Sequence, residues 1–165
     1  MVEIDKVSIH FNDPTGTYDH DSFALEDAIR NMVNKAKKSL HLVSYSLPNY
    51  NSEWYLHDII EDCVNRGVKL IVHANSKTEV QRLVARHRHR NIAGYSWVKE
   101  GDSDIFHIKA IIVDGIRLYL GSANLSQNAI THSAEWGMIS HSPEICLSLE
   151  KYLKHLQNIG RFEVI

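Results

Sequence analysis

Segments whose apolar residues have the spacing of a strand alternate along this chain with segments that have the spacing of a helix. This order predicts short strands separated by amphipathic helices. Runs rich in β-branched residues predict four strands in the first hundred residues: 7–11, 39–47, 68–74 and 92–98. Apolar residues at helical spacing predict three helices between them: one that begins at Asp21 or Ser22, residues 54–66, and one that begins at Thr78. Strands that alternate with helices in this way are typical of a mainly parallel sheet with right-handed crossovers.

Beyond residue 105 the pattern predicts two strands joined by a tight turn. A β-branched run opens at His107 and stops at Asp114-Gly115, a pair typical of hairpin turns, and residues 116–120 form the returning strand. The rest is predicted as a polar connection, a strand and a closing helix, at residues 126–132, 134–140 and 143–159. Together the elements predict an α/β fold whose mixed, mainly parallel central sheet is flanked by helices on both faces.

The composition is that of an ordinary folded domain. The chain has 165 residues, of which 44% are hydrophobic and 23% charged, so we expect residues 1–165 to form a single domain. The sequence contains neither a signal-peptide pattern nor a run of about eighteen apolar residues, so we expect a cytoplasmic protein that does not enter the membrane. Cys63 and Cys146 are expected to be reduced core thiols.

Four polar side chains fall at alternate positions of the predicted hairpin. His107 and Lys109 are two residues apart, so they face the same side of a strand, and Ser122 and Asn124 repeat this spacing. Burying a lysine and a histidine in so apolar a stretch is costly unless an anion meets them. The pattern therefore indicates a phosphate site. For an isolated H-x-K the alternative is a core histidine beside a lysine that extends to solvent.

The four residues belong to a longer pattern that resembles the HxKx4D and GSxN motifs of the phospholipase D superfamily: His107, Lys109, Asp114, Gly121, Ser122 and Asn124. The resemblance implies the phospholipase D-like half-barrel fold and is strongest to the single-motif small bacterial endonucleases. Glu135 lies where those nucleases carry an acidic residue that orients the catalytic histidine. The strand end Tyr45-Ser46 is similar to one that lies beside their active site.

A single motif implies half of an active site, because superfamily members of double length carry two motifs that face each other. A symmetric homodimer would bring two copies of His107 together. One copy would attack phosphorus, forming a phosphohistidine, and the other would protonate the leaving oxygen. Lys109 and Asn124 would stabilise the charge, so no metal or other cofactor is required. Asp114 and Gly121 are expected to shape the motif without contacting the substrate.

The substrate is less well specified, because the motif serves lipases, lipid synthases, nucleases and tyrosyl-DNA hydrolases. Chain length and the lack of a membrane-binding amphipathic helix favour an endonuclease that cleaves DNA, or RNA, largely without regard to sequence. A partner protein would then supply any targeting. A phospholipid hydrolase and a catalytically silent nucleic-acid-binding module are the alternatives.

Two charged stretches bear on nucleic-acid binding. Arg86, Arg88 and Arg90 form the densest positive cluster in a chain of net charge −2. The cluster either follows a nucleic-acid backbone or complements the dipole of the helix that it ends, and the sequence supports both roles. Residues 99–104 form an acidic loop just before His107, where carboxylates would repel phosphate unless they point away.

Overall fold

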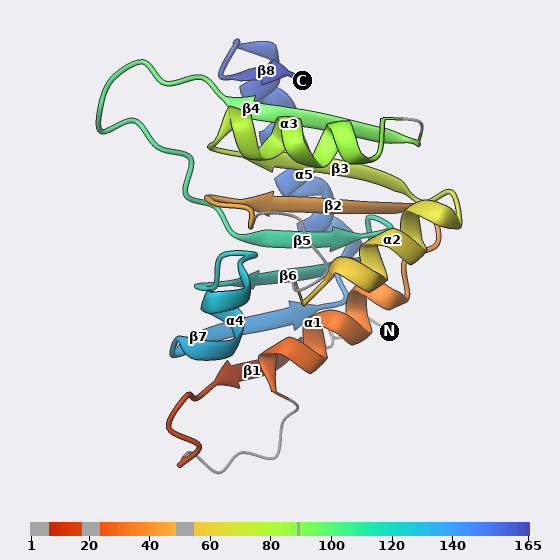
Figure 1. The fold of residues 1–165 in the computed structure, drawn as a ribbon, viewed down its shortest axis with the longest axis vertical. Coiled ribbons are helices and arrows are strands. Elements are labelled where there is room, and N and C mark those ends of the chain that lie inside the picture. The colour runs from red at the N-terminus through yellow and green to blue at the C-terminus, as the bar shows by residue number, and fades with distance from the viewer. Residues whose placement is uncertain (1–6, 18–23, 49–54, 89) are drawn as a thin grey trace.

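Eight strands form one mixed sheet in this computed structural model, which describes residues 7–17, 24–48, 55–88 and 90–165 (Figure 1). The strands are β1 (Val7–Asn12), β2 (Ser39–Ser44), β3 (Lys69–Ala74), β4 (Ile92–Trp97), β5 (Ala110–Val113), β6 (Arg117–Gly121), β7 (Glu135–Ser140) and β8 (Phe162–Val164). Their order across the sheet is β1-β7-β6-β5-β2-β3-β4-β8. The predicted strands in the first hundred residues correspond to β1 to β4.

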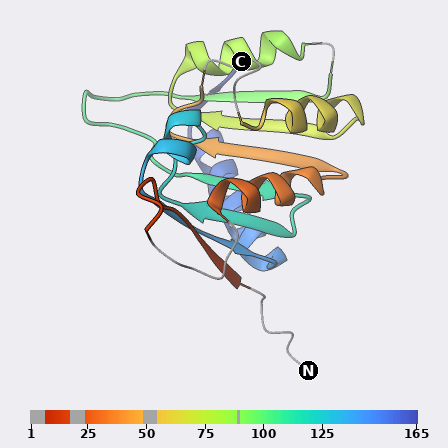
Figure 2. The ribbon, with the colours of Figure 1, turned by 60° about the horizontal axis from the view of Figure 1, so that its bottom comes forward.

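Helices cover both faces of the sheet, as predicted (Figures 1 and 2). They are α1 (Leu25–Asn34), α2 (His57–Asn65), α3 (Lys77–Arg86), α4 (Gln127–His132) and α5 (Pro143–Asn158). The first four lie on one face and α5 lies on the other. The α/β fold class is therefore confirmed. The predicted start of the first helix at Asp21 or Ser22, and residue 54 of the second, lie outside the described residues.

The expectation of a mainly parallel sheet is wrong. Only β2–β3 and β3–β4 pair in parallel among the described strands, and the other five neighbouring pairs are antiparallel. The helical crossovers through α2 and α3 produce the two parallel pairs. A short turn reverses the chain between β5 and β6, and the connection from β6 to β7 passes through α4. The strand β1 joins the sheet beside β7, far from its neighbour in sequence.

Two short elements were not predicted from the sequence. Residues 126–132 look polar, yet Ala129 and Ile130 turn into the core and Ser126 caps α4 by accepting a hydrogen bond from the Ala129 N–H. The strand β8 has only three residues, too few to show a period, and it is held at the sheet edge by pairing with β4. Both elements depend on tertiary contacts.

The glycine of the GSxN motif makes room for a buried tyrosine. Gly121 pairs with Gly137 across β6 and β7, and the fully buried ring of Tyr119 packs against both. A Cβ atom at Gly121 would lie 2.4 Å from the Tyr119 hydroxyl and 2.6 Å from the Trp136 carbonyl oxygen. A larger residue at position 121 would therefore collide with Tyr119 and with the backbone of β7.

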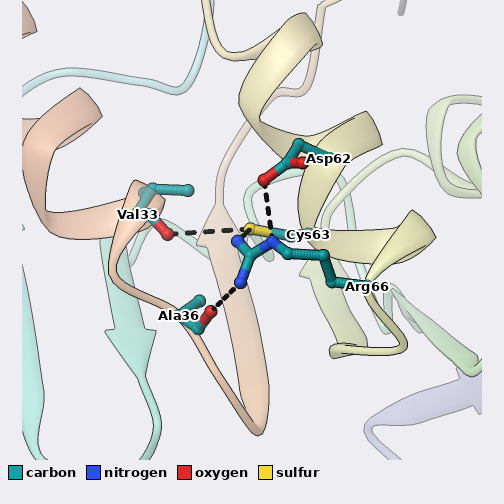
Figure 3. Close-up of polar contacts among 5 residues, drawn as sticks. All are labelled: Val33, Ala36, Asp62, Cys63 and Arg66. Atoms are coloured by element: carbon teal, nitrogen blue, oxygen red, sulfur yellow. Dashed lines mark hydrogen bonds and ion pairs between the residues drawn. The ribbon is translucent and has the colours of Figure 1, made fainter.

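Cys63 and Cys146 are buried and unbonded to each other, as expected. The Cys63 thiol donates to the Val33 carbonyl, while Arg66 donates to the Ala36 carbonyl and pairs with Asp62 (Figure 3). Burial, the largest influence, raises the pKa of Cys63. This group of contacts joins the end of α2 to the end of α1, and Cys63 serves packing.

Two histidines form a buried polar pair between the sheet and α5. His41 Nε2 and His73 Nδ1 are 2.7 Å apart, and the Gln157 amide nitrogen lies 2.7 Å from His73 Nε2. The His73 ring also stacks on Tyr95 at a centroid distance of 4.5 Å. Burial lowers the pKa of His41 to about 4 and that of His73 to about 2. Both rings are therefore neutral in the folded protein at pH 7.

These lowered pKa values predict acid-sensitive folding. Between about pH 4 and pH 6.5 the unfolded chain binds more protons at His41 and His73 than the folded chain does. The free energy of unfolding should therefore fall as pH falls through this window, by up to about 1.4 kcal/mol per pH unit for each histidine. Urea unfolding between pH 8 and pH 4 measures the slope. In a double variant, His41→Leu with His73→Phe, this part of the slope should disappear, and an unchanged slope would contradict the assignment.

Candidate active site

His107 and Lys109 lie in an extended segment directly before β5, and the prediction that they belong to the strand is wrong. The reason is the register: Val43 of β2 pairs with Ala110, so Lys109 lies level with Ser44 and Gly121, the last residues of β2 and β6, and His107 extends past both strands. The segment leads into β5 at the left edge of the sheet in Figure 1, where β2, β3 and β4 end. The exposed His107 side chain is thus available for chemistry, with the buried Lys109 beside it.

The two side chains meet, as their spacing predicted. Lys109 Nζ lies 3.1 Å from Nε2 and 3.2 Å from Nδ1 of His107, and it donates to the His107 carbonyl at 3.1 Å. Tyr45, at the end of β2, packs edge-on against the His107 ring with a centroid distance of 5.1 Å. The ammonium also lies 5.9 Å from the centre of the Tyr45 ring.

Lys109 is a buried cation without a carboxylate partner. Its exposed fraction is 8%, and no carboxylate oxygen of the described residues lies within 4 Å of Nζ. Burial, the largest influence, lowers the pKa of Lys109, and the more distant charge of Glu135 opposes that shift. A site with one incompletely compensated cation beside an exposed imidazole is suited to an anion.

Ser122 and Glu135 form a second pair at the same edge of the sheet. The Ser122 hydroxyl donates to the Glu135 carboxylate, and it accepts from the Trp136 N–H at 3.0 Å. Glu135 was expected to accept from His107, but among the described side chains no hydrogen bond joins the two. Through Lys109 and Ser122, Glu135 still acts on the charge and shape of the site.

The loop after β6 carries Asn124. The Gly121 N–H donates to the Lys109 carbonyl at 3.4 Å, which places the start of this loop beside the histidine–lysine segment. The side-chain oxygen of Asn124 is buried and has no hydrogen-bond partner among the described residues. Its side chain is thus not consumed by the internal contacts seen around Ser122.

The acidic loop before His107 is neutralised by a residue that the sequence analysis did not identify. Arg161, just before β8, pairs with Glu100 at 2.6 Å and also with Asp104. Its guanidinium group lies over the Trp97 ring, 4.4 Å from the centroid. The spacing of more than fifty residues hides this contact from sequence reasoning. Two of the carboxylates that would repel phosphate therefore face an arginine.

Asp114 lies at the hairpin turn between β5 and β6. With φ of 58°, it adopts the left-handed conformation at the hairpin turn, followed by Gly115 at 68°. Its carboxylate accepts from the backbone N–H groups of Lys37, Lys38 and Ser39, which precede or begin β2. Burial would raise the pKa of Asp114, but these three donors hold it below its usual value. The motif aspartate thus connects the hairpin turn between β5 and β6 to the start of β2.

The arginine cluster lies at the opposite end of the sheet from His107. Helix α3 begins at the motif edge and ends at Arg86, so the cluster follows its far end (Figure 1). Arg86 pairs with Glu61 of α2 at 2.9 Å, and Arg90 donates to the Asn65 side chain at 3.1 Å. These contacts support a role in joining α2 to α3.

The described residues form neither a metal site nor a membrane-spanning helix. They contain no group of three or more histidine, cysteine, aspartate or glutamate side chains arranged to bind a metal ion. None of the helices in the described ranges has the length and apolar character needed to cross a bilayer.

Comparison with known proteins identifies one family and one curated relative. The family described as "Cardiolipin synthase, PLD-like domain" matches residues 29–157. The DISARM protein DrmC of Bacillus paralicheniformis is 26% identical over 141 residues, which is 83% of this chain. The chain covers 58% of that relative, less than two thirds of its length.

Solved structures share the fold at low sequence identity. A phospholipase D family member, Nuc from Salmonella typhimurium, is 17% identical with a TM-score of 0.69, over 98% of this chain and 99% of Nuc. NucT from Helicobacter pylori is 16% identical with a TM-score of 0.68, over 94% and 97% of the two chains. A phosphatidylserine synthase from Haemophilus influenzae is 16% identical with a TM-score of 0.75, over 98% of this chain and 40% of the synthase.

Asp114 accepts hydrogen bonds from three backbone N–H groups, so we expect it to stabilise the folded protein. Asp114→Asn should lower the free energy of unfolding at pH 7 by about 1–3 kcal/mol, because an amide cannot face three donors as a carboxylate does. The folded-state pKa of Asp114 is lowered, so its stabilisation is present above the unfolded pKa and lost as pH falls through the folded one. Urea unfolding at pH 7 and pH 3 should show the difference from wild type shrinking in acid.

Asp102→Asn, in the exposed part of the acidic loop, is the matched control and should leave the free energy of unfolding within about 0.5 kcal/mol of wild type. Equal free energies of unfolding for the Asp114 and Asp102 variants at pH 7 would contradict the stabilising role of Asp114.

Proposed function

Because this chain belongs to the phospholipase D-like family, we propose that it is a phosphodiesterase that cleaves nucleic acid. The observation that carries the proposal is the buried ammonium of Lys109 against the His107 ring, with no carboxylate of the described residues to neutralise it. A phosphodiester oxygen supplies the missing negative charge, and the imidazole is then beside phosphorus.

The proposed mechanism uses two copies of His107. A neutral imidazole nitrogen of one copy donates its lone pair to phosphorus, and the bond from phosphorus to the leaving oxygen breaks as the partner's His107 protonates that oxygen. Water then attacks the phosphohistidine, with the partner's His107 taking its proton, and His107 leaves with the pair of electrons. Lys109 and Asn124 stabilise the charge on the phosphoryl oxygens. Ser122 and Glu135 hold the loop that carries Asn124.

The single motif supports a homodimer, and the structural neighbours support a nucleic-acid substrate. The chain covers 99% of Nuc and 97% of NucT but 40% of the phosphatidylserine synthase, so only the synthase has room for two such units. TrmBL2, an archaeal chromatin protein with a novel mode of DNA binding, shares the fold with a TM-score of 0.59. The proposed unit of function is a symmetric dimer whose two motifs complete one site.

The direct test is turnover of a substrate panel. We expect cleavage of plasmid, single-stranded DNA or RNA in the presence of EDTA, because Lys109 and Asn124 supply the charge that a metal would otherwise provide. His107→Ala should be inactive on every substrate, which excludes a contaminating nuclease. Hydrolysis of phosphatidylcholine vesicles alone would instead indicate a phospholipase. Binding of nucleic acid without turnover would indicate a silent binding module.

A mixed dimer of wild-type and His107→Ala subunits tests the shared site. Such a dimer retains one histidine for two roles, so its rate on DNA should fall about 100-fold or more, the usual contribution of a general acid. The dimer is purified through two different affinity tags, and the wild-type dimer that carries both tags is the control. A rate of half the wild-type value would mean that each subunit acts alone.

A further inference from the structure

A pocket of about 310 Å³ adjoins the candidate active site on the side of Tyr45. It lies at the carboxyl ends of β2 and β3 and at the start of α3, and its lining residues are Tyr45, Ser46, Asn75, Ser76, Glu79 and Lys99. Tyr45 also packs against His107, so one side chain separates the pocket from the histidine–lysine pair. If a phosphate of the substrate binds at Lys109, the part of the substrate next to that phosphate can reach this pocket.

Glu79 gives the pocket an acidic wall. Its backbone N–H donates to the Ser76 hydroxyl, which caps α3, and its carboxylate oxygen Oε2 accepts from the Leu47 N–H at 2.8 Å. No lysine or arginine nitrogen of the described residues lies within 4 Å of this carboxylate. Burial, the largest influence, raises the pKa of Glu79. The carboxylate is held in place, partly desolvated, with acceptor capacity remaining.

A carboxylate at this position disfavours a second phosphate and favours a hydrogen-bond donor. In a nucleic acid, the hydrogen-bond donors next to the phosphate belong to the sugar or the base. Of these two, only the base differs from one nucleotide to the next. The same lining also contains donors: Lys99 has an ammonium group, and Asn75 uses its side-chain oxygen to accept from the Phe106 N–H, which leaves its amide nitrogen as a donor.

A lining that combines a carboxylate acceptor with donors discriminates among the four bases. Guanine has two adjacent donors, N1–H and the N2 amine, with O6 as an acceptor beside them. Adenine and cytosine place a ring-nitrogen acceptor next to their amine, and that lone pair would face the carboxylate. Thymine and uracil have one donor between two carbonyl groups. The Watson–Crick edge is open only in an unpaired base.

We propose that this pocket binds an unpaired guanine next to the scissile phosphate, with Glu79 accepting from N1 and N2 and with Lys99 or Asn75 donating to O6. The inference rests on the proposed nuclease function and narrows it to single-stranded substrate with a preference at one nucleotide. The Tyr45 ring, between pocket and motif, offers an aromatic surface beside the base or its sugar.

The test is Glu79→Gln, measured as kcat/KM on single-stranded oligonucleotides that differ only in the base beside the cleaved bond. Glutamine keeps a carbonyl oxygen for the Leu47 N–H but replaces the second acceptor with a donor. We expect the wild type to prefer guanine by about 10- to 100-fold and the variant to lose that preference, with its rate on the other bases retained. Glu150→Gln, at a half-buried glutamate of α5, is the matched control and should behave as wild type.

Base analogues separate recognition from a structural role of Glu79. Inosine lacks the N2 amine, so its cleavage by wild type should fall toward that of adenine, whereas 7-deazaguanine keeps the Watson–Crick edge and should be cleaved like guanine. Equal cleavage of all four bases by wild type, or an unchanged guanine preference in Glu79→Gln, overturns this inference and leaves the nuclease function standing. A wild-type protein that cleaves no nucleic acid overturns the proposed function itself.

Discussion

The buried ammonium of Lys109 is the constraint on which the arrangement of the site depends. A cation that is 8% exposed and lacks a carboxylate within ion-pair distance is unfavourable in an empty site, because burial penalises its charge. The protein compensates in part with the His107 carbonyl and ring nitrogens and with the face of Tyr45. These neutral partners leave most of the interaction energy for an anionic ligand. A carboxylate at the same distance would stabilise the fold and block the site.

The fold supplies this constraint through the end of a strand. Because Lys109 lies level with the last residues of β2 and β6, His107 extends past the ladder, while the hairpin behind it stays fixed. Asp114 connects the far end of that hairpin to the start of β2, and the Gly121 N–H donates to the Lys109 carbonyl at the near end. The candidate catalytic segment is thus fixed at Lys109, and His107 lies beyond the paired strands. His107 and Lys109, at the start of the motif, carry the candidate chemistry, and Asp114, at its end, supports the structure.

Local features of the sequence were sufficient for the motif, the hairpin and most elements. The two-residue spacing of His107 and Lys109 and the turn at Asp114-Gly115 are readable because each depends on neighbouring residues. Strand pairing is not local, so the majority of antiparallel pairs was missed. The same reason explains Arg161, whose partners lie more than fifty residues earlier, and the strand β8 beside it. The hydrogen bond between Glu135 and Ser122 was not predicted, because it depends on the β6–β7 register.

Several carboxylates near the candidate site have partners, which moderates their repulsion of a phosphate. Glu100 and Asp104 face Arg161, Glu135 is bonded by Ser122, and Glu79 is bonded by the Leu47 N–H. The distant arginines contribute little to this local field. A six-residue strand separates the two ends of the sheet by about 20 Å, roughly two Debye lengths at physiological salt. The electrostatics of the candidate site therefore depend on how its nearby carboxylates are paired, and net charge was a poor guide to them.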